Sequence, residues 1–359
     1  MVGVMFRIRN GRLFVLLFLL GVALAAVAPL PLGARSRPPA VPVSQAAPDR
    51  AFTDWLADLR AEALAKGVRA ETLDQALAGI EPLPIVVERD QAQPELTLPL
   101  DRYLARRLTR QIVARARQAS GRHATLLRQV SAKYGIPAPV VVAVWGLESN
   151  FGRFSGVRPT ITTLATLAYQ THRAAFFRAE LLDALTILDR GYIDLAQMKG
   201  SWAGAMGQAQ FMPSSYLRFA EDFDGDGRRD IWSSEADVLA SIANYLKMHG
   251  WSSGQRWGRA VRVPAGAAAK IGEAAPLRTD GCDAARQLTQ PLPLTRWHQL
   301  GVRMPGGQRL PKSEIPASLL RIDNRNYLVY PNYEAFLAYN CAHAYALSVG
   351  LLSDRIGTR

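Results

Sequence analysis

The sequence has few of the residues that hold transition metals or cross-link a chain. Its 359 residues include five His and two Cys, and the His residues have no zinc-site spacing, which argues against a zinc centre. Cys282 and Cys341 leave two alternatives open. One is a disulfide, which would close a loop of about 60 residues and stabilise the fold by about 4 kcal/mol; the other is two buried thiols that never meet. No internal repeat is visible, which argues against a repeat architecture.

Long apolar runs are also scarce, and the clearest one lies at the N-terminus. Arg7, Arg9 and Arg12 precede the run "LFVLLFLLGVALAAVA", and small residues up to Ala28 offer cleavage sites, so residues 1–28 are predicted to be a signal peptide. The rival interpretation is an uncleaved anchor, but the run is short against the roughly 20 residues of a membrane span. No Cys lies near the junction, so we expect a periplasmic protein that is not a lipoprotein. Residues 29–50, rich in Pro and Ala without periodicity, are predicted to be a linker.

Acidic residues are outnumbered by basic ones. The formal net charge of +13 falls to +10 when the three Arg of the signal peptide are removed. Nucleic acid is the usual partner of such a charge, but an exported protein rarely meets it. Cell-wall carboxylates or phosphates fit the compartment better, and a merely Arg-rich surface is the alternative.

From residue 51 onward the hydrophobic pattern is mainly helical. Apolar spacing at i, i+3, i+4 and i+7 together with Gly and Pro stops predicts helices over 51–67, about 98–119, 122–134, 139–148, 171–190, 234–249 and about 333–355. From about residue 257, alternating stretches such as "AVRV", "LLRI" and "YLVY" lie between Gly and Pro clusters and predict small strands. The expected fold is therefore mainly α (α+β), with a small β-containing portion.

Glu148 closes the apolar run "PVVVAVWGLESNFG" at residues 139–152. The valines also suit a strand, but on a helix Val141, Val144, Trp145 and Glu148 share one face. Desolvation and the negative end of the helix dipole then predict a raised pKa for Glu148, as a general acid needs. The alternative is a buried Glu paired with an Arg.

A second stretch, "GSWAGAMGQAQFMPSSY" at residues 200–216, combines small residues with amides and an aromatic ring. Small residues let a backbone approach a ligand closely. Gln208 and Gln210 offer both donors and acceptors, and Phe211 beside them suits contact with a sugar ring. The alternative is a tight buried crossover.

A third stretch, "DFDGDGRRDIWSSEAD", predicts a Ca²⁺ loop at residues 222–237. Its spacing places Asp222, Asp224, Asp226, Arg228 and Asp230 at EF-hand positions 1, 3, 5, 7 and 9. Ser233 stands at position 12, where a Glu is expected, so Glu235 or Asp237 would have to complete the ligands. The alternative is an Asp-Gly turn without metal.

The three stretches, in this order, resemble the lytic murein transglycosylases of the B type. The resemblance runs from about Asp54 to the C-terminus and includes "DQAQPELT" at 90–97, "FFRAELLDALTIL" at 176–188 and "NYEAFLAYNCAHAYALSV" at 332–349. It implies a catalytic region over 51–359, with a lysozyme-like core at about 98–256 and an additional helical segment. Two positions depart from the family pattern: Ala209 replaces a Pro, and His172 a second Arg, which leaves the charge pattern of the groove open.

The resemblance also implies a function and a set of site residues. Glu148 would be the sole catalytic acid and base, cleaving peptidoglycan between MurNAc and GlcNAc to leave 1,6-anhydroMurNAc ends. Residues implied to line the site are Tyr103, Arg173, Ser201, Gln210, Phe211, Tyr245, Asn340 and Tyr345. Catalysis would need no cofactor, Ca²⁺ would be structural, and the partners would be glycan strands and cell-wall synthesis or lysis complexes, bound by a monomer. A water-using muramidase and a non-catalytic wall-binding protein are the alternatives.

Overall fold

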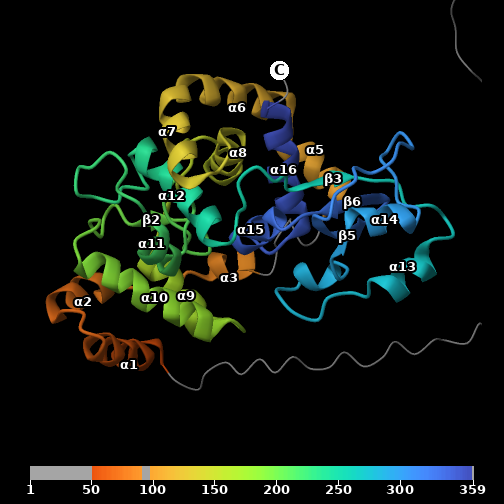
Figure 1. Ribbon diagram of the computed structural model, residues 1–359. Helices are drawn as coiled ribbons and strands as arrows, with labels where there is room; N and C mark the ends of the chain where they lie inside the picture. Colours follow the sequence, from red (N-terminus) through yellow and green to blue (C-terminus); the bar gives the residue numbers. More distant parts are fainter. Residues whose placement is uncertain (1–50, 91–97, 358–359) are drawn as a thin grey trace, which may run out of the picture. The chain divides into compact units, whose positions relative to one another are not determined.

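The computed structural model describes residues 51–90 and 98–357. The predicted signal peptide and linker, and most of the "DQAQPELT" block, lie outside the described residues. The first helices are α1 (Phe52–Ala65), α2 (Ala70–Leu77), α3 (Pro84–Asp90), α5 (Leu100–Arg107), α6 (Arg110–Arg122), α7 (Ala124–Tyr134) and α8 (Ala138–Ser149). They are followed by α9 (Thr160–Gln170), α10 (Ala174–Asp189), α11 (Pro213–Phe219), α12 (Glu235–Met248), α13 (Ala268–Ala274), α14 (Leu294–Gln299), α15 (Asn332–Tyr339) and α16 (His343–Gly357). The mainly helical fold class is confirmed (Figure 1).

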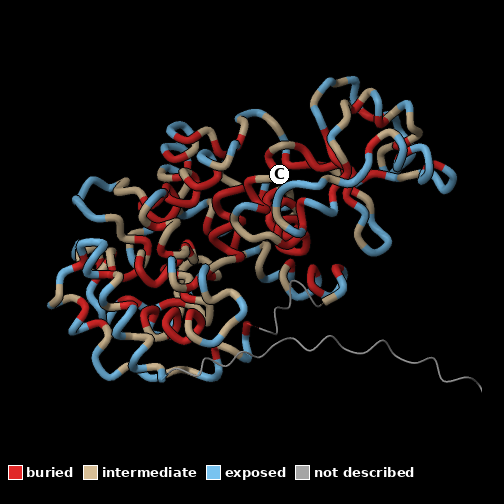
Figure 2. Tube along the Cα trace, turned by 90° about the horizontal axis from the view of Figure 1, so that it is seen from below, coloured by how far each residue is buried: buried red, intermediate tan, exposed pale blue. Residues whose placement is uncertain are grey.

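Helix α8 is the central helix of the main hydrophobic core. Every residue from Val140 to Leu147 is buried, and α16, α6, α12 and α7 pack around it. The helix is confirmed and the strand alternative is wrong. The expected single apolar face is also wrong, because α8 is covered on all sides. Buried positions run through the interior of the helical part, and exposed positions gather on its loops and outer turns (Figure 2).

Two predicted long helices are each broken into two. Leu108 and Thr109 separate α5 from α6, and the Thr109 hydroxyl accepts the backbone N–H of Ile112 at 3.2 Å, which makes Thr109 an N-cap. Near the C-terminus, Asn340 adopts an extended conformation (φ −150°, ψ 118°) and ends α15. Periodicity continues across both breaks, so apolar spacing alone did not reveal them.

The second break carries the disulfide. Cys341, between α15 and α16, is bonded to Cys282, which lies 59 residues earlier. Of the two alternatives that the sequence left open, the structure contains the bridge. It ties the segment after α13 to the turn that joins the last two helices.

The β structure forms two small antiparallel sheets. Strands β1 (Arg158–Pro159) and β2 (Lys199–Gly200) pair directly. The larger sheet has the order β3-β6-β5-β4, from β3 (Gly258–Ala260), β6 (Arg325–Val329), β5 (Pro316–Ile322) and β4 (Leu292–Pro293). The predicted strands at "LLRI" and "YLVY" fall in β5 and β6. Of "AVRV", Ala260 ends β3 and Arg262 forms an isolated antiparallel bridge with Arg303.

The larger sheet has a hydrophobic core of its own. The register pairs Leu319 with Leu328, and both pack with Leu294 and Trp297 of α14 in this second core. The indole N–H of Trp297 donates to the carbonyl of Ala317 at 2.8 Å, so the ring is satisfied while buried. Figure 1 shows this sheet with α13 and α14 set apart from α9, α10 and α2.

Within residues 51–90 and 98–357, no single helix is long and apolar enough to cross a membrane. The bent pair of α7 and α8, which meet at 110°, reaches the required length and apolarity together. Because α8 is buried in the core, this pair has the character of interior helices.

Candidate active site

Glu148 occupies the last turn of α8, where the chain turns sharply. Asn150 takes the left-handed conformation (φ 52°) and caps the helix, and Phe151 and Gly152 also have positive φ. The turn folds the Phe151 ring back onto α8. A Cβ at Gly146 would lie 2.5 Å from that ring, so only glycine leaves room for it. Glu148 itself is half-buried.

Two arginines from neighbouring helices hold this helix end. Arg107 donates to the carbonyl of Leu147 at 2.6 Å, and Arg115 donates to the side-chain oxygen of Asn150 at 3.2 Å. A cation at the C-terminus of a helix interacts favourably with the unpaired carbonyls there. The backbone on either side of Glu148 is therefore fixed by contacts with two neighbouring helices.

Three tyrosines from three helices lie near Glu148. Burial raises the pKa of Tyr245 to about 12, with the charge of Glu148 adding to the shift and Arg218 opposing it. Burial raises the pKa of Tyr339 and of Tyr345 well above the ordinary value, and the charge of Glu148 adds to both. A side-chain interaction between Tyr345 and Glu148 contributes as well. The raised pKa values keep all three phenols neutral at physiological pH, so their hydroxyls can donate hydrogen bonds.

The tyrosine rings form a packed wall fixed to the backbone. The hydroxyl of Tyr245 donates to the carbonyl of Ala338, and that of Tyr339 donates to the carbonyl of Ala209, both at 2.7 Å. The ring centroids of Tyr245 and Tyr339 are 4.6 Å apart, and Phe211 lies behind them at 5.4 and 5.9 Å. Tyr339 is absent from the predicted site residues. The sequence feature that could have identified Tyr339 is its position beside Asn340 in the block "NYEAFLAYNCAHAYALSV".

The loop over residues 200–211 approaches the same wall. Ser201 accepts the backbone N–H groups of Ala203 and Ala205 at 3.3 and 3.2 Å, so its hydroxyl shapes the loop. Gln210 has a positive φ of 50°, and its amide donates to the carbonyl of Gly207 at 2.9 Å. Phe211 is 1% exposed, so it supports the tyrosines from within the core.

Gln208 connects this loop to α8. Its side-chain oxygen accepts the indole N–H of Trp145 at 2.9 Å, and its amide donates to the carbonyl of Trp232 at 2.9 Å. Buried polar groups need such partners. Gln208 is therefore the residue that couples the helix of Glu148 to the segment before α12.

The remaining predicted residues take different places. Tyr103 is buried and lies near enough to Tyr345 to add to the raised pKa of that phenol, which puts it on the side of the tyrosine wall. Asn340 is half-buried in the break after α15. Arg173 forms an ion pair with the buried Asp90, and its guanidinium lies over the Phe177 ring at 4.8 Å. His172, the departure from the family pattern, is exposed.

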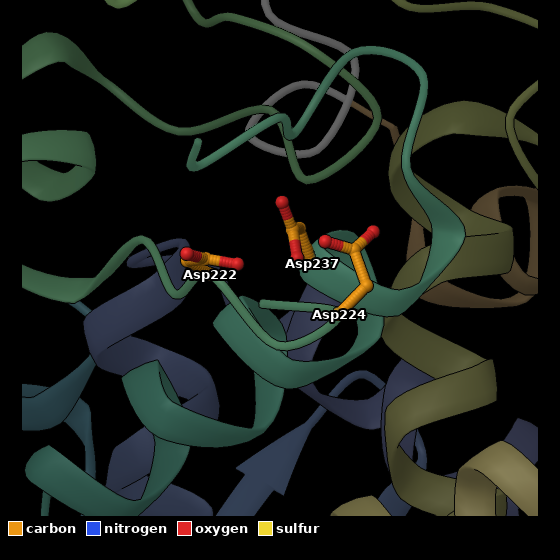
Figure 3. Close-up of side chains that lie close together, drawn as sticks. All are labelled: Asp222, Asp224 and Asp237. Atoms are coloured by element: carbon orange, nitrogen blue, oxygen red, sulfur yellow. The ribbon is translucent and has the colours of Figure 1, made fainter. Parts of the chain in front are cut away.

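The acidic loop brings three predicted carboxylates together. One oxygen each from Asp222, Asp224 and Asp237 lie within 4.8 Å of one another, and Figure 3 shows the side chains grouped between the loop and the first turn of α12. Burial raises the pKa of Asp237, with nearby Asp224 adding to the shift and backbone N–H groups opposing it. A cation would relieve this crowding of negative charge.

Two other predicted metal ligands, Asp226 and Asp230, accept hydrogen bonds from backbone N–H groups of their own loop. Asp226 accepts the backbone N–H of Arg228 at 2.8 Å, and Asp230 accepts those of Trp232 and Ser233, both at 2.9 Å. The carboxylates of Asp226 and Asp230 thus lie outside the group of three. Of the two candidates for completing the loop, Asp237 joins the group, whereas Glu235 lies 3.4 Å from His123.

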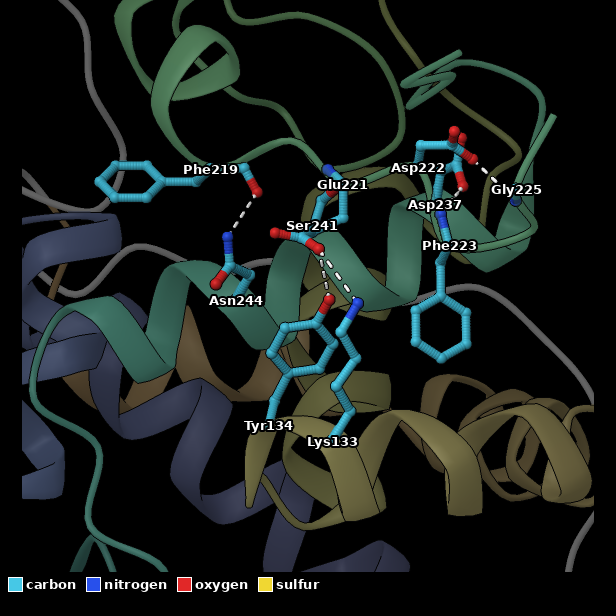
Figure 4. A network of polar contacts seen from close by, with 10 residues as sticks. All are labelled: Lys133, Tyr134, Phe219, Glu221, Asp222, Phe223, Gly225, Asp237, Ser241 and Asn244. Carbon is cyan, nitrogen blue, oxygen red and sulfur yellow. Dashed lines mark hydrogen bonds and ion pairs between the residues drawn. The ribbon is translucent and has the colours of Figure 1, made fainter. Parts of the chain in front are cut away.

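A polar network anchors the loop at its start. Glu221 accepts the hydroxyl of Tyr134 at 2.7 Å and pairs with Lys133 at 3.3 Å, and its backbone N–H donates to Ser241 at 2.9 Å. Figure 4 shows these contacts linking the loop to α7 and α12. The start of the loop is therefore fixed to two packed helices.

Comparison with known proteins shows the family of the chain. Residues 51–354 match the family described as Transglycosylase SLT domain. The Membrane-bound lytic murein transglycosylase B of Escherichia coli (strain K12) is 34% identical over 233 residues, which cover 62% of this chain and 58% of that protein. The chain thus spans less than two thirds of the length of this curated relative.

Solved structures of related proteins match a larger share of this chain than the curated relative does. SltB3 from Pseudomonas aeruginosa, in complex with NAG-anhNAM-pentapeptide, is 44% identical with a TM-score of 0.77, covering 86% of this chain and 80% of that one. Escherichia coli Slt35, in complex with calcium, is 27% identical with a TM-score of 0.70, covering 84% and 92%. The resemblance stated from the sequence is confirmed: the chain belongs to the lytic murein transglycosylase B family.

Proposed function

We propose that this protein is a peptidoglycan lytic transglycosylase that cleaves the bond between MurNAc and GlcNAc. The observation that carries the proposal is the placement of Glu148 at the end of a rigid buried helix, beside three neutral tyrosines. The ligands of relatives support it, since SltB3 was solved with NAG-NAM-pentapeptide as well as with its anhydro form. A substrate of this kind carries both a glycan and a peptide.

In the proposed reaction Glu148 acts first as acid and then as base. Its proton goes to the glycosidic oxygen as the bond from that oxygen to C1 of MurNAc breaks. The N-acetyl oxygen of MurNAc stabilises the cationic centre. The Glu148 carboxylate then takes the proton of the C6 hydroxyl as O6 bonds to C1. The product is a 1,6-anhydro sugar, and no water is consumed.

The carboxylate found beside the tyrosines, among the described residues, favours this route over hydrolysis. Retaining and inverting glycosidases normally use two carboxylates, whereas Glu148 is the carboxylate whose charge acts on all three tyrosines. A positioned hydroxyl also has a very high effective concentration relative to free water. The tyrosine wall would hold the MurNAc ring so that O6 reaches C1. Tyr345, which interacts with Glu148, is best placed to orient the carboxyl group.

The acidic loop would hold a structural Ca²⁺. Three carboxylates within 4.8 Å of one another fit a hard cation that prefers oxygen ligands, and the relative Slt35 was solved with calcium. Asp222, Asp224 and Asp237 would be the side-chain ligands. When bound, the ion would supply charge neutralisation for the loop, and no step of the reaction passes through it.

Export completes the proposal. The features of residues 1–28 favour a signal peptide, and the substrate lies outside the cytoplasm. We expect a mature N-terminus between about residues 24 and 35. N-terminal sequencing of the protein from cells tests this, and an intact N-terminus in the membrane fraction would show an anchor instead.

The activity is tested with Glu148→Gln, which keeps the shape of the side chain and loses the transferable proton. We expect cleavage of peptidoglycan sacculi to fall below a few per cent of wild type while melting temperature and glycan binding are unchanged. Glu314→Gln, the same change at an exposed site in the larger-sheet portion, is the matched control and should keep full activity.

The products separate a transglycosylase from a hydrolase. Digested sacculi should yield muropeptides lighter by one water than the hydrolysis products, without a reducing MurNAc end. Mass spectra dominated by hydrated, borohydride-reducible ends would establish a muramidase. Binding without any cleavage would establish a wall-binding protein.

A further inference from the structure

The larger sheet continues past β5 as two short extended segments. Residues 288–290, just before β4, run beside β5, and the N–H of Thr289 donates to the carbonyl of Leu319 at 3.2 Å. Residues 276–278 pair in turn with this segment, because Leu277 and Thr289 form an isolated antiparallel bridge. Residues 276–278, which we call the free edge, are therefore the outermost segment on this side of the sheet.

The backbone of Leu277 points away from the sheet. The N–H of Arg278 donates to the carbonyl of Leu288 at 2.9 Å. On the other side of Leu277, the N–H of Gln290 donates to the carbonyl of Pro276 at 2.7 Å. A residue between two such bonds of an antiparallel pair directs its own N–H and C=O outward, and neither group of Leu277 has a backbone partner in the described part of the chain. Leu277 therefore offers one donor and one acceptor to a further strand.

The free edge is fixed from the opposite face of the sheet. Neighbouring residues of an extended segment point to opposite faces, so Arg278 and Leu277 face different ways. Arg278 donates to the hydroxyl of Ser318 at 2.8 Å and forms an ion pair with Glu334 of α15, while Leu277 is 60% exposed. A strand that pairs here meets a backbone already held in place, so binding orders only the incoming segment.

A cavity of about 320 Å³ lies beside the free edge, between α13 and the sheet. Its apolar lining combines small side chains of α13 with larger ones: Ala268, Ile271, Gly272, Ala275, Leu277 and Leu319. A Cβ added at Gly272 would meet no atom within 4 Å, so α13 leaves this space open. The side chain of a residue paired with Leu277 would stand on the same face as Leu277, which is the face of the cavity.

The charge around the cavity favours an acidic partner. Arg321 is the charged residue among the lining residues. It is exposed and forms no ion pair within residues 51–90 and 98–357. Between residues 257 and 330 the sequence has eleven Lys and Arg against five Asp and Glu. Complementary charge speeds association and favours the correct partner, so an incoming segment that carries carboxylates suits this part of the molecule.

We propose that the free edge and its cavity bind an extended, acidic segment of a partner protein as an added β-strand. Leu277 supplies both main-chain hydrogen bonds, the cavity takes one apolar side chain of the segment, and Arg321 faces its carboxylates. Main-chain pairing gives such contacts affinity, and side-chain pockets give them specificity. Because α13 lies far from α8 in Figure 1, the site recruits a partner without taking part in cleavage, and the inference does not depend on the proposed reaction.

The test uses the mature protein and a fluorescein-labelled heptapeptide in which Val and Glu alternate, followed by fluorescence anisotropy. We expect saturable binding and about a fivefold higher Kd for Leu277→Pro, which deletes the outward N–H but no internal hydrogen bond. Leu277→Ala keeps this N–H and should raise the Kd less. Gly272→Leu fills the cavity and should also raise the Kd about fivefold. Gly266→Leu, the same change outside the cavity lining, is the matched control and should leave it unchanged.

Further measurements separate strand pairing from other kinds of contact. Melting temperature and cleavage of sacculi should be unchanged in these variants, because the site lies apart from Glu148. A heptapeptide with Lys in place of Glu should bind about tenfold more weakly. No saturable binding of the Glu peptide, equal binding of the two peptides, or equal effects of Leu277→Pro and Leu277→Ala would overturn the proposal. A wild-type dimer that becomes monomeric in Leu277→Pro would overturn it in favour of a second copy of this chain.

Discussion

Removing the disulfide should cost this protein a large part of its stability. The change is Cys282→Ala/Cys341→Ala, which deletes both sulfurs together and leaves no free thiol. The bridge joins residues 59 apart, and the chain-entropy relation for a loop of this length gives about 4 kcal/mol at 25 °C. Domains of ordinary stability have about 5–15 kcal/mol in total, so the loss would be visible under mild conditions.

The position of the bridge predicts a second effect. Cys341 lies in the break between α15 and α16, with Tyr339 at the end of one helix and Tyr345 near the start of the next. Losing the cross-link frees the turn that sets the spacing of these two tyrosines around Glu148. We therefore expect kcat to fall as well, at temperatures where the variant is still folded.

The assay is urea denaturation followed by tryptophan fluorescence, with the free energy of unfolding extrapolated to water. Wild-type protein treated with a reductant serves as an independent route to the same state and should match the double variant. A loss below about 1 kcal/mol, or a reduced wild type that differs clearly from the variant, would refute the reasoning from loop length.

Three further predictions concern buried polar groups. Burial lowers the pKa of His343 from 6.5 to about 4. As the pH falls, the unfolded chain binds a proton on this imidazole before the folded chain does. The free energy of unfolding should therefore decline by about 3 kcal/mol between about pH 6.5 and pH 4. Urea titrations at several pH values check this, and the decline should shrink in His343→Gln. Gln208→Leu strands the indole N–H of Trp145 and the carbonyl of Trp232, and should cost about 2–4 kcal/mol; a loss under 1 kcal/mol in the same assay would contradict it. Asp237→Asn should abolish the rise in melting temperature that Ca²⁺ gives the wild type, as scanning calorimetry would reveal, whereas an undiminished rise would place the ion elsewhere.

Local sequence determined the helix that carries Glu148 and the carboxylate cluster of the acidic loop. The Pro-flanked apolar run over 139–149 predicts a helix that ends at Glu148, and α8 has these bounds to within a residue. The Asp spacing at 222 and 224 predicts a carboxylate cluster, because short loops with alternating Asp and Gly bend their side chains toward one point. The family motifs were readable for the same reason: each lies within one short segment whose local conformation positions its own residues.

What the tertiary structure alone decided is which of these segments meet. Apolar periodicity runs through the breaks at Leu108–Thr109 and Asn340–Ala342, and there a capping hydroxyl and a distant Cys282 override it. Phe211 is an aromatic residue of the kind that contacts sugar rings, but it is buried behind Tyr245. Such outcomes depend on partners far away in the chain, and burial and pairing are properties of contacts that no local pattern encodes.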